Sequence, residues 1–258
     1  MLLKKLRNQA LSVHLLITLL LLCVNGLAWA EDVDVFAAED YPKVSFLKDG
    51  KPAGVFPEVL AAVSPYSGDR YVLHLMPWKR AQAMAARGLG GVAHFSWTQE
   101  RAAVFDYSDP VLGDEIQLVV VKGQEFVYRS PADLRGKRVG AKLGASFGQQ
   151  IDEQFSQGSF SVDRDLSAGS RLRKLLRGRI DVAVIEGIHG DLRPLARAEA
   201  MNDGDLAQLV VLVQPLVNDQ LHLAFAKSGN WQAVLQRFNH GLAQLKNTDA
   251  YQAILRAN

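Results

Sequence analysis

Strand-like and helix-like segments alternate along almost the whole sequence after residue 30, and this pattern restricts the fold more than any other feature. Residues 33–37 and 71–76 alternate apolar and polar side chains with a period of two, which predicts strands. Residues 78–87 are rich in Ala, Met and Gln and are followed by Gly88, which predicts a helix with a glycine stop. The later part of the chain repeats this scheme. Strands and helices that alternate at this spacing predict an α/β protein with mainly parallel sheets.

The other expected elements follow from the same patterns. Further strands are expected at residues 91–95, 116–121, 138–143, 181–185, 209–213 and 221–225. Helices are expected from Pro57 onward and at residues 98–104, 147–155, 171–177 and 231–245. Open parallel sheets bind ligands beyond the carboxyl ends of their strands. The first candidates for a site are therefore residues 39–41, Trp78, residues 96–101, residues 144–148 and Glu186.

The first thirty residues have the composition of an export signal. Lys4, Lys5 and Arg7 precede an apolar stretch at residues 15–24, and Ala28-Trp29-Ala30 forms a small-x-small cleavage site. The apolar stretch is shorter than the roughly 18 residues that indicate a membrane span. We expect cleavage after Ala30 and a mature protein in the periplasm.

Charge and cysteine content exclude several classes of protein. The chain has 29 basic and 27 acidic residues, and removing three basic residues with the signal leaves 26 against 27. A nucleic-acid binder usually shows a clear basic excess, so this class is excluded. The single cysteine, Cys23, lies in the signal, so the mature chain has no disulfide, thiol nucleophile or zinc–thiolate site. The histidines show no metal-ligand spacing, and we expect no metal or cofactor. The basic run at residues 171–179 is interpreted as a solvated helix face.

The segment Ser96–Arg101 is the most informative one. If Thr98 caps the helix, Arg101 lies in the first turn, where the helix dipole disfavours a cation. An anion would remove this conflict, because helix N–H groups and a guanidinium together bind carboxylate or phosphate. The alternative is that Arg101 pairs with Asp106 or Asp109, or points into solvent.

Residues 144–148 match G-x-S-x-G between a strand and a helix, with Ser146 at the centre. This is the context of a hydrolase nucleophile, and possible partners follow in order as Asp181 or Asp191 and then His222 or His240. A turn that presents backbone N–H groups to an anionic ligand has the same sequence requirements. A purely structural turn is the third interpretation.

Four other candidates each have two interpretations. Glu186 ends a strand and either receives a ligand ammonium or is an exposed strand terminus. Trp78 and Tyr41 either stack on a ligand or pack in the core. Lys142, near the end of its strand, points either to the site or to solvent.

The sequence resembles the bacterial extracellular solute-binding proteins of the polar amino-acid type, the periplasmic receptors of ABC importers. Thr98-x-x-Arg101 with Asp109-Pro110 downstream is the most specific part of the likeness. The segments that carry it are residues 39–42, 50–56, 77–81, 96–101 with 105–110, 134–140, and 178–184.

The resemblance implies a two-lobed type II periplasmic-binding-protein fold, in which the chain crosses twice between lobes. Lobe one would comprise residues 31–112 and 220–258, and lobe two residues 113–219. Each lobe would be a mainly parallel sheet flanked by helices. The resemblance also implies binding rather than catalysis.

The resemblance assigns roles to the candidate residues. Arg101 would hold the ligand α-carboxylate, assisted by Ser96 and Ser146. Glu186 takes the place of the family's aspartate for the α-ammonium. Tyr41 matches the family's stacking aromatic, and Lys142 a strand position that in some members reaches the ligand side chain. Trp78 stays a candidate from its place after a predicted strand.

The expected function is therefore a periplasmic receptor, acting as a monomer, that closes on a small zwitterionic or anionic solute, most plausibly an amino acid. It would deliver this solute to an inner-membrane ABC permease. The alternative is an enzyme on a similar fold. Such an enzyme would be a Ser146 hydrolase, or a small-acid dehydratase with Glu186 as its general acid.

Overall fold

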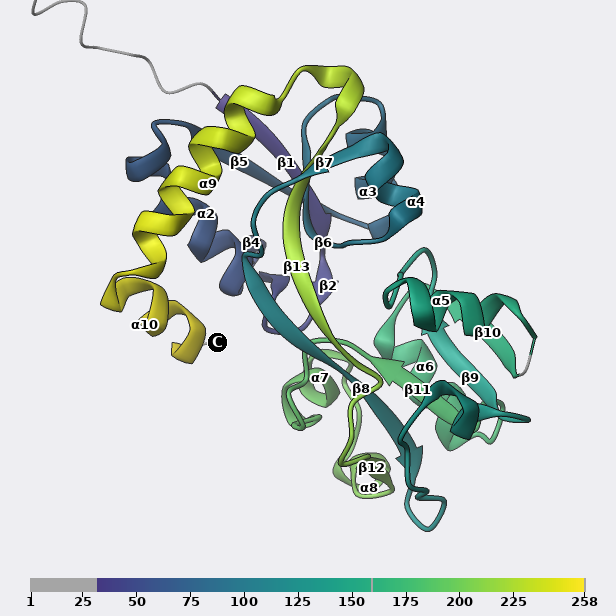
Figure 1. Cartoon of the computed structure of the whole chain (residues 1–258). Helices are drawn as coiled ribbons and strands as arrows, with labels where there is room; N and C mark the ends of the chain where they lie inside the picture. Colours follow the sequence, from purple (N-terminus) through teal and green to yellow (C-terminus); the bar gives the residue numbers. More distant parts are fainter. Residues whose placement is uncertain (1–31, 159, 258) are drawn as a thin grey trace, which may run out of the picture. The chain divides into compact units, whose positions relative to one another are not determined.

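The computed structural model of the chain describes residues 32–158 and 160–257 (Figure 1). The predicted export signal, residues 1–30, and its cleavage site lie outside the described residues. Strands and helices alternate through most of the described chain, which confirms the α/β fold class. No helix in residues 32–158 or 160–257 has both the length and the apolar character that crossing a membrane requires.

The first part of the chain forms a parallel set of strands around β1 (Asp32–Ala38). β1 pairs in parallel with β5 (Arg70–Met76) on one side and with β6 (Gly91–Ser96) on the other. The last four residues of β1 and all six of β6 are buried, as expected for parallel strands covered on both faces.

Two helices connect these strands. α2 (Val55–Ser67) begins two residues before Pro57, where the sequence predicted its start. Proline is tolerated there because N–H groups of the first helical turn have no intrahelical partner. α3 (Trp78–Ala86) follows β5 directly, and its buried residues include Trp78, Ala81 and Ala85.

The second part of the chain repeats this arrangement. β9 (Arg138–Lys142) pairs in parallel with β10 (Ser161–Asp165) and with β11 (Val182–Ile185). α5 (Gln149–Ser156) and α6 (Ala168–Leu176) connect these strands in sequence. β10 was not predicted, because an edge strand with the sequence SVDRD has no apolar face to reveal it.

Two long strands link the two parallel sets. β8 (Leu112–Val121) and β13 (Val217–Ala226) pair antiparallel to each other, from Leu112 opposite Leu221 to Ile116 opposite Val217. β8 also pairs antiparallel with β11, and β13 with β6. Figure 1 shows the two strands running side by side between the two sets. The sheet is therefore mixed, with parallel strands on both flanks and an antiparallel centre.

The remaining elements are a small separate sheet, several short segments and the two C-terminal helices. β2 to β4 form a separate three-stranded sheet. These elements are β2 (Asp40–Tyr41), β3 (Ser45–Lys48), β4 (Lys51–Ala53), α4 (Gln99–Val104), β7 (Phe105–Tyr107), η1 (Pro131–Leu134), α7 (Arg193–Ala198), α8 (Asp203–Leu206), β12 (Leu209–Val211), η2 (Lys227–Gly229), α9 (Gln232–Lys246) and α10 (Asp249–Ala257).

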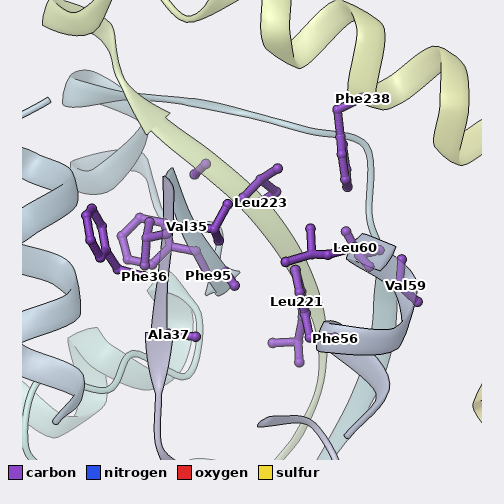
Figure 2. Packing of buried hydrophobic residues seen from close by; sticks show 14 of the residues in the cluster. Val35, Phe36, Ala37, Phe56, Val59, Leu60, Phe95, Leu221, Leu223 and Phe238 are labelled. Carbon is purple, nitrogen blue, oxygen red and sulfur yellow. The ribbon is translucent and has the colours of Figure 1, made fainter. Parts of the chain in front are cut away.

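Buried apolar side chains form separate clusters in the two parts. Figure 2 shows the first cluster, in which Val35, Phe56, Phe95, Leu223 and Phe238 come from β1, α2, β6, β13 and α9. Every buried member of this cluster lies in residues 33–112 or 221–251. The buried members of the two other clusters all lie in residues 116–217. Each part therefore has a core of its own. Burial of each large apolar side chain in these cores contributes about 1.5–3 kcal/mol.

Candidate functional site

One small cavity, with a volume of about 30 Å³, is lined from both parts of the chain. Six of the seven predicted ligand-binding residues line it, and Arg101 does not. The six are Tyr41, Trp78, Ser96, Lys142, Ser146 and Glu186. The other lining residues are Ala38, His94, Ile116, Ala145 and Phe147.

The topology explains why these residues meet. Ala38, Ser96 and Lys142 are the last residues of β1, β6 and β9, and Glu186 directly follows β11. Trp78 begins the helix that follows β5. The cavity therefore lies at the carboxyl ends of the parallel strands, which is where the sequence placed the candidate site. Whether these side chains bind a ligand stays a prediction.

Glu186 has one oxygen bound and one oxygen free. Its Oε2 accepts a hydrogen bond of 3.0 Å from Nη2 of Arg171. Its Oε1 is buried and has no hydrogen-bond partner among the described residues. A buried carboxylate oxygen without a donor is costly, so a ligand N–H or ammonium at this place would remove an existing penalty.

Arg171 is the clearest correction to the sequence analysis. The basic run was interpreted as a solvated face, but the Arg171 side chain is only 1% exposed. Besides Glu186 it contacts Asp165, with 3.4 Å between Nη1 and Oδ1. Arg171 lies on the face of α6 that also buries Leu172 and Leu175, whereas Arg173 on the same helix is exposed.

Lys142 lines the cavity and forms an ion pair with an acid of the first part of the chain. Its ammonium donates to Asp40 Oδ1, and its side chain is 9% exposed. Asp40 belongs to β2, in the first part of the chain, so this ion pair links the two parts of the chain beside the cavity.

Arg101 lies beside the cavity and is bound to carbonyl oxygens. The Thr98 side chain accepts from the Arg101 backbone N–H at 3.1 Å, so the predicted helix cap is confirmed. The guanidinium donates to the carbonyls of Ser96 at 3.0 Å and Gly144 at 3.2 Å, and it lies 4.2 Å from the Phe95 ring centroid. Burial lowers the pKa of Arg101. Neither Asp106 nor Asp109 is its partner; Asp106, for example, accepts from Gln232.

The carbonyl of Gly144 accepts from three side chains at once. Besides Arg101, the indole N–H of Trp78 and the amide of Gln82 donate to it, each at 3.1 Å. Gln82 was not predicted, although its position four residues after Trp78 on α3 places the two side chains on one helix face. A carbonyl oxygen has two lone pairs, so three donors exceed what it ordinarily accepts.

Aromatic rings form the wall around His94. Trp78 and Tyr41 each lie 5.0 Å from His94 between ring centroids. His94 Nε2 accepts from the Ala38 backbone N–H at 3.0 Å, and burial lowers the pKa of His94 to about 3. The imidazole is therefore neutral at physiological pH. Its backbone has a φ of 44°, a conformation uncommon for a non-glycine residue.

The catalytic partners that a hydrolase would need lie elsewhere. The Ser146 hydroxyl donates to Asp152, at the start of α5, and accepts from the Gly148 N–H. The Nδ1 atom of His222 lies 2.8 Å from the carbonyl of Ser108, and His240 contacts Gln244. Asp181 and Asp191 are bound to Arg138 and Arg193. Among the described residues, no group of three or more His, Cys, Asp and Glu side chains is arranged to hold a metal ion.

Two parts of the chain are linked by two crossing strands, and both line a cavity at the strand ends. This architecture defines a binding protein of the periplasmic type II class. Residues 33–257 match the family model of the bacterial extracellular solute-binding proteins, family 3. The chain therefore belongs to this family, and the predicted resemblance is confirmed.

Individual relatives agree with this assignment. The probable amino-acid-binding protein YxeM of Bacillus subtilis is 23% identical over 248 residues, which cover 92% of this chain and 88% of that protein. The L-cystine-binding protein TcyJ of Escherichia coli is 25% identical over 217 residues, 83% of this chain and 77% of that protein.

Solved structures show the same fold. An ancestral arginine-binding protein bound to arginine has a TM-score of 0.72 at 22% identity, with 89% of this chain and 98% of that chain covered. A histidine kinase sensor domain with similarity to periplasmic binding proteins has a TM-score of 0.73 at 22% identity, with 89% and 96% covered.

Proposed function

We propose that this protein is an exported receptor that binds an amino acid or a related small carboxylate in the cavity between two lobes. The observation that carries the proposal is the free Oε1 atom of Glu186, a buried acceptor at a cavity lined from both parts of the chain. A zwitterion suits this site because its ammonium can take the free oxygen of Glu186. Its carboxylate can accept hydrogen bonds from the side chains that now donate to the Gly144 carbonyl.

Lobe one comprises residues 31–112 and 220–258, and lobe two residues 113–219. The separate apolar clusters support this division, because their buried members fall on the two sides of these boundaries. Hinge motion would bend β8 and β13, the two strands that cross between the lobes. Since Arg101 and Ser96 lie in one lobe and Glu186 and Ser146 in the other, a ligand that contacts both stabilises the closed state more than the open one.

Opening of the lobes separates Arg101 from Gly144 and frees its guanidinium. A ligand carboxylate then replaces the Gly144 carbonyl as the acceptor, in a charge-assisted hydrogen bond that is stronger than the one it replaces. Binding rather than catalysis fits the site, since the Ser146 hydroxyl is bound to Asp152.

The receptor acts in the periplasm as a monomer, after cleavage following Ala30, and delivers its ligand to an inner-membrane ABC permease. Membership of an extracellular solute-binding family supports export and transport. The names of the relatives support an amino-acid ligand.

A thermal-shift screen tests the proposal. The full chain is expressed in a bacterial host and purified from the periplasmic fraction, where N-terminal sequencing locates the cleavage site. L-arginine, L-glutamine and L-cystine are compared with agmatine, which lacks the carboxylate of arginine. A ligand at 100 times its dissociation constant adds about 2.7 kcal/mol, or roughly 5–10 °C for a chain of this size.

The Arg101→Ala substitution should abolish the shift for every carboxylate ligand, and Glu186→Gln should weaken binding of ammonium-bearing ligands. Arg193→Ala, which removes an exposed partner of Asp191, is the control and should leave the shift unchanged. A full shift in the Arg101→Ala variant would place the carboxylate elsewhere. The absence of any shift with the three amino acids would contradict the proposed ligand class.

A further inference from the structure

A buried acid on the crossing strand β8 joins two walls of the cavity. The side chain of Asp114 is 0% exposed. Its Oδ2 accepts from the Tyr41 hydroxyl at 2.8 Å and from the Gly187 backbone N–H at 3.1 Å. Tyr41 comes from β2, whereas Gly187 follows β11, so one carboxylate oxygen connects the two lobes of the proposed receptor.

One partner of Asp114 lines the cavity, and the other is next in sequence to a residue that lines it. Tyr41 lines the cavity, and Gly187 is adjacent to Glu186, which also lines it. Gly187 packs directly on Tyr41 and Pro42: a Cβ at Gly187 would lie 3.0 Å from the Tyr41 ring and would collide with the Pro42 carbonyl. The position of the Tyr41 ring and that of the Glu186 carboxylate therefore depend on the same contact.

From this geometry we propose that Asp114 is a positioning residue, which holds the Tyr41 ring and the Glu186–Gly187 peptide in the arrangement that receives a ligand. The proposal rests on the proposed binding function of the cavity. Asp114 does not line the cavity and acts only through its two partners.

Other acids surround Asp114, and their charges affect its protonation. Asp219 on β13 is directly opposite in the strand pairing, so both side chains lie on the same face of the sheet. Glu186 and Glu115 add further negative charge. The imidazole of His189 has its Nε2 3.4 Å from Asp114 Oδ1, and burial lowers the pKa of His189. Burial raises the pKa of Asp114 to about 6, and burial likewise raises that of Asp219 to about 6.

Protonation should therefore weaken the positioning. The ionised carboxylate accepts two charge-assisted hydrogen bonds, and these lose strength when Asp114 becomes neutral near pH 6. Because Asp114 and Asp219 interact, the two acids titrate together, and removing one changes the midpoint of the other.

Calorimetric titrations with L-arginine, L-glutamine and L-cystine between pH 5 and 8 test the proposal. For a probe that binds, wild-type affinity should fall as the pH falls through 6. The Asp114→Asn variant should bind about tenfold more weakly at pH 7 and lose this component of the pH profile. The Asp219→Asn variant should keep wild-type affinity at pH 7 and move the midpoint to lower pH. Wild-type affinity and an unchanged pH profile in the Asp114→Asn variant would overturn the proposal.

A second measurement needs no ligand and therefore separates this proposal from the proposed function. Urea unfolding of Asp114→Asn, Tyr41→Phe and the double variant forms a double-mutant cycle. We expect a coupling of about fivefold or more in the unfolding equilibrium constant. Tyr107→Phe is the control, since its hydroxyl donates to Ser96 and its effect should be additive with Asp114→Asn. Additive effects of Asp114→Asn and Tyr41→Phe would overturn the positioning role even if all three probes bind.

Discussion

Replacing Arg171 by Met should cost about 3–5 kcal/mol of unfolding free energy at pH 7, the range for a buried ion pair that loses one partner. The Arg171 side chain is 1% exposed, and those of Glu186 and Asp165 are 10% and 7% exposed. Water therefore cannot replace the guanidinium, and two buried carboxylates remain without it. Methionine keeps the apolar stem, so the loss measures the charge and its hydrogen bonds. With an m-value of about 3 kcal/mol/M, the urea midpoint should fall by roughly 1–2 M.

The matched control is Arg173→Met on the same helix. Arg173 forms a 3.5 Å ion pair with Glu199 but is 44% exposed, so its loss should cost under about 1 kcal/mol. The Arg171→Met deficit should also shrink toward pH 5. Burial already raises the pKa of Asp165, while Arg171 opposes this rise, so without Arg171 the acid takes up a proton more readily. Equal costs for the two variants, or a cost for Arg171→Met below 1 kcal/mol, would refute this account of the buried pair.

Two further predictions concern the hinge and the cavity wall. Because the pKa values of Asp114 and Asp219 rise from 3.8 to about 6, the folded state binds their protons more tightly. Each acid therefore adds up to about 3 kcal/mol of stability that is present below pH 4 and lost as the pH rises through 6. The contribution of His94 to stability has the opposite pH dependence, because burial lowers its pKa. The test is therefore the difference in urea stability between wild type and each Asp→Asn variant, measured from pH 4.5 to 7.5. A difference that does not change with pH would contradict the prediction. Replacing Gly187 (φ 70°) by Ala should cost about 2–4 kcal/mol, since a Cβ meets Tyr41 and Pro42. Gly190→Ala, with a φ of 78° and open space around it, should cost about 1–2 kcal/mol in the same assay, and equal costs would exclude the collision.

The cavity could be located from the sequence because its position depends on topology alone. Apolar alternation marked β1 and β5, and strands were also expected at residues 91–95 and 181–185, so the residues after these strands could be named without knowing any contact. The strands of each parallel set end at one edge, and the antiparallel centre turns the two sets in opposite directions. Ser96 at the end of β6 and Glu186 after β11 therefore both line the cavity, although ninety residues separate them. This argument needs only the order and direction of the strands.

The direction of a charged side chain depends instead on residues far away in the sequence. The capping argument gave the start of α4 at Thr98 correctly but left the partner of Arg101 open. Its partners are the nearby Ser96 carbonyl and the Gly144 carbonyl, 43 positions later. Arg171 is a partial exception, because its place on the buried face of α6 follows from the helical period. The helical period could not predict that Asp165 and Glu186 pair with Arg171, and these two acids make its burial possible.

Asp114 shows how a polar residue at an inward strand position can itself be informative. The sequence predicted a strand from residue 116, but β8 begins at Leu112, and its first five residues alternate between buried and exposed. Asp114 therefore takes an inward position that an apolar side chain would normally occupy. Burying a carboxylate is costly unless it accepts hydrogen bonds, so an acid in such a register predicts donors on neighbouring elements. Here the Tyr41 hydroxyl and the Gly187 N–H donate to Oδ2 from the two parts of the chain, whereas the buried Oδ1 has no hydrogen-bond partner among the described residues. The acid that interrupts the apolar pattern of β8 thus indicates the position of the site more directly than the apolar residues of the strand do.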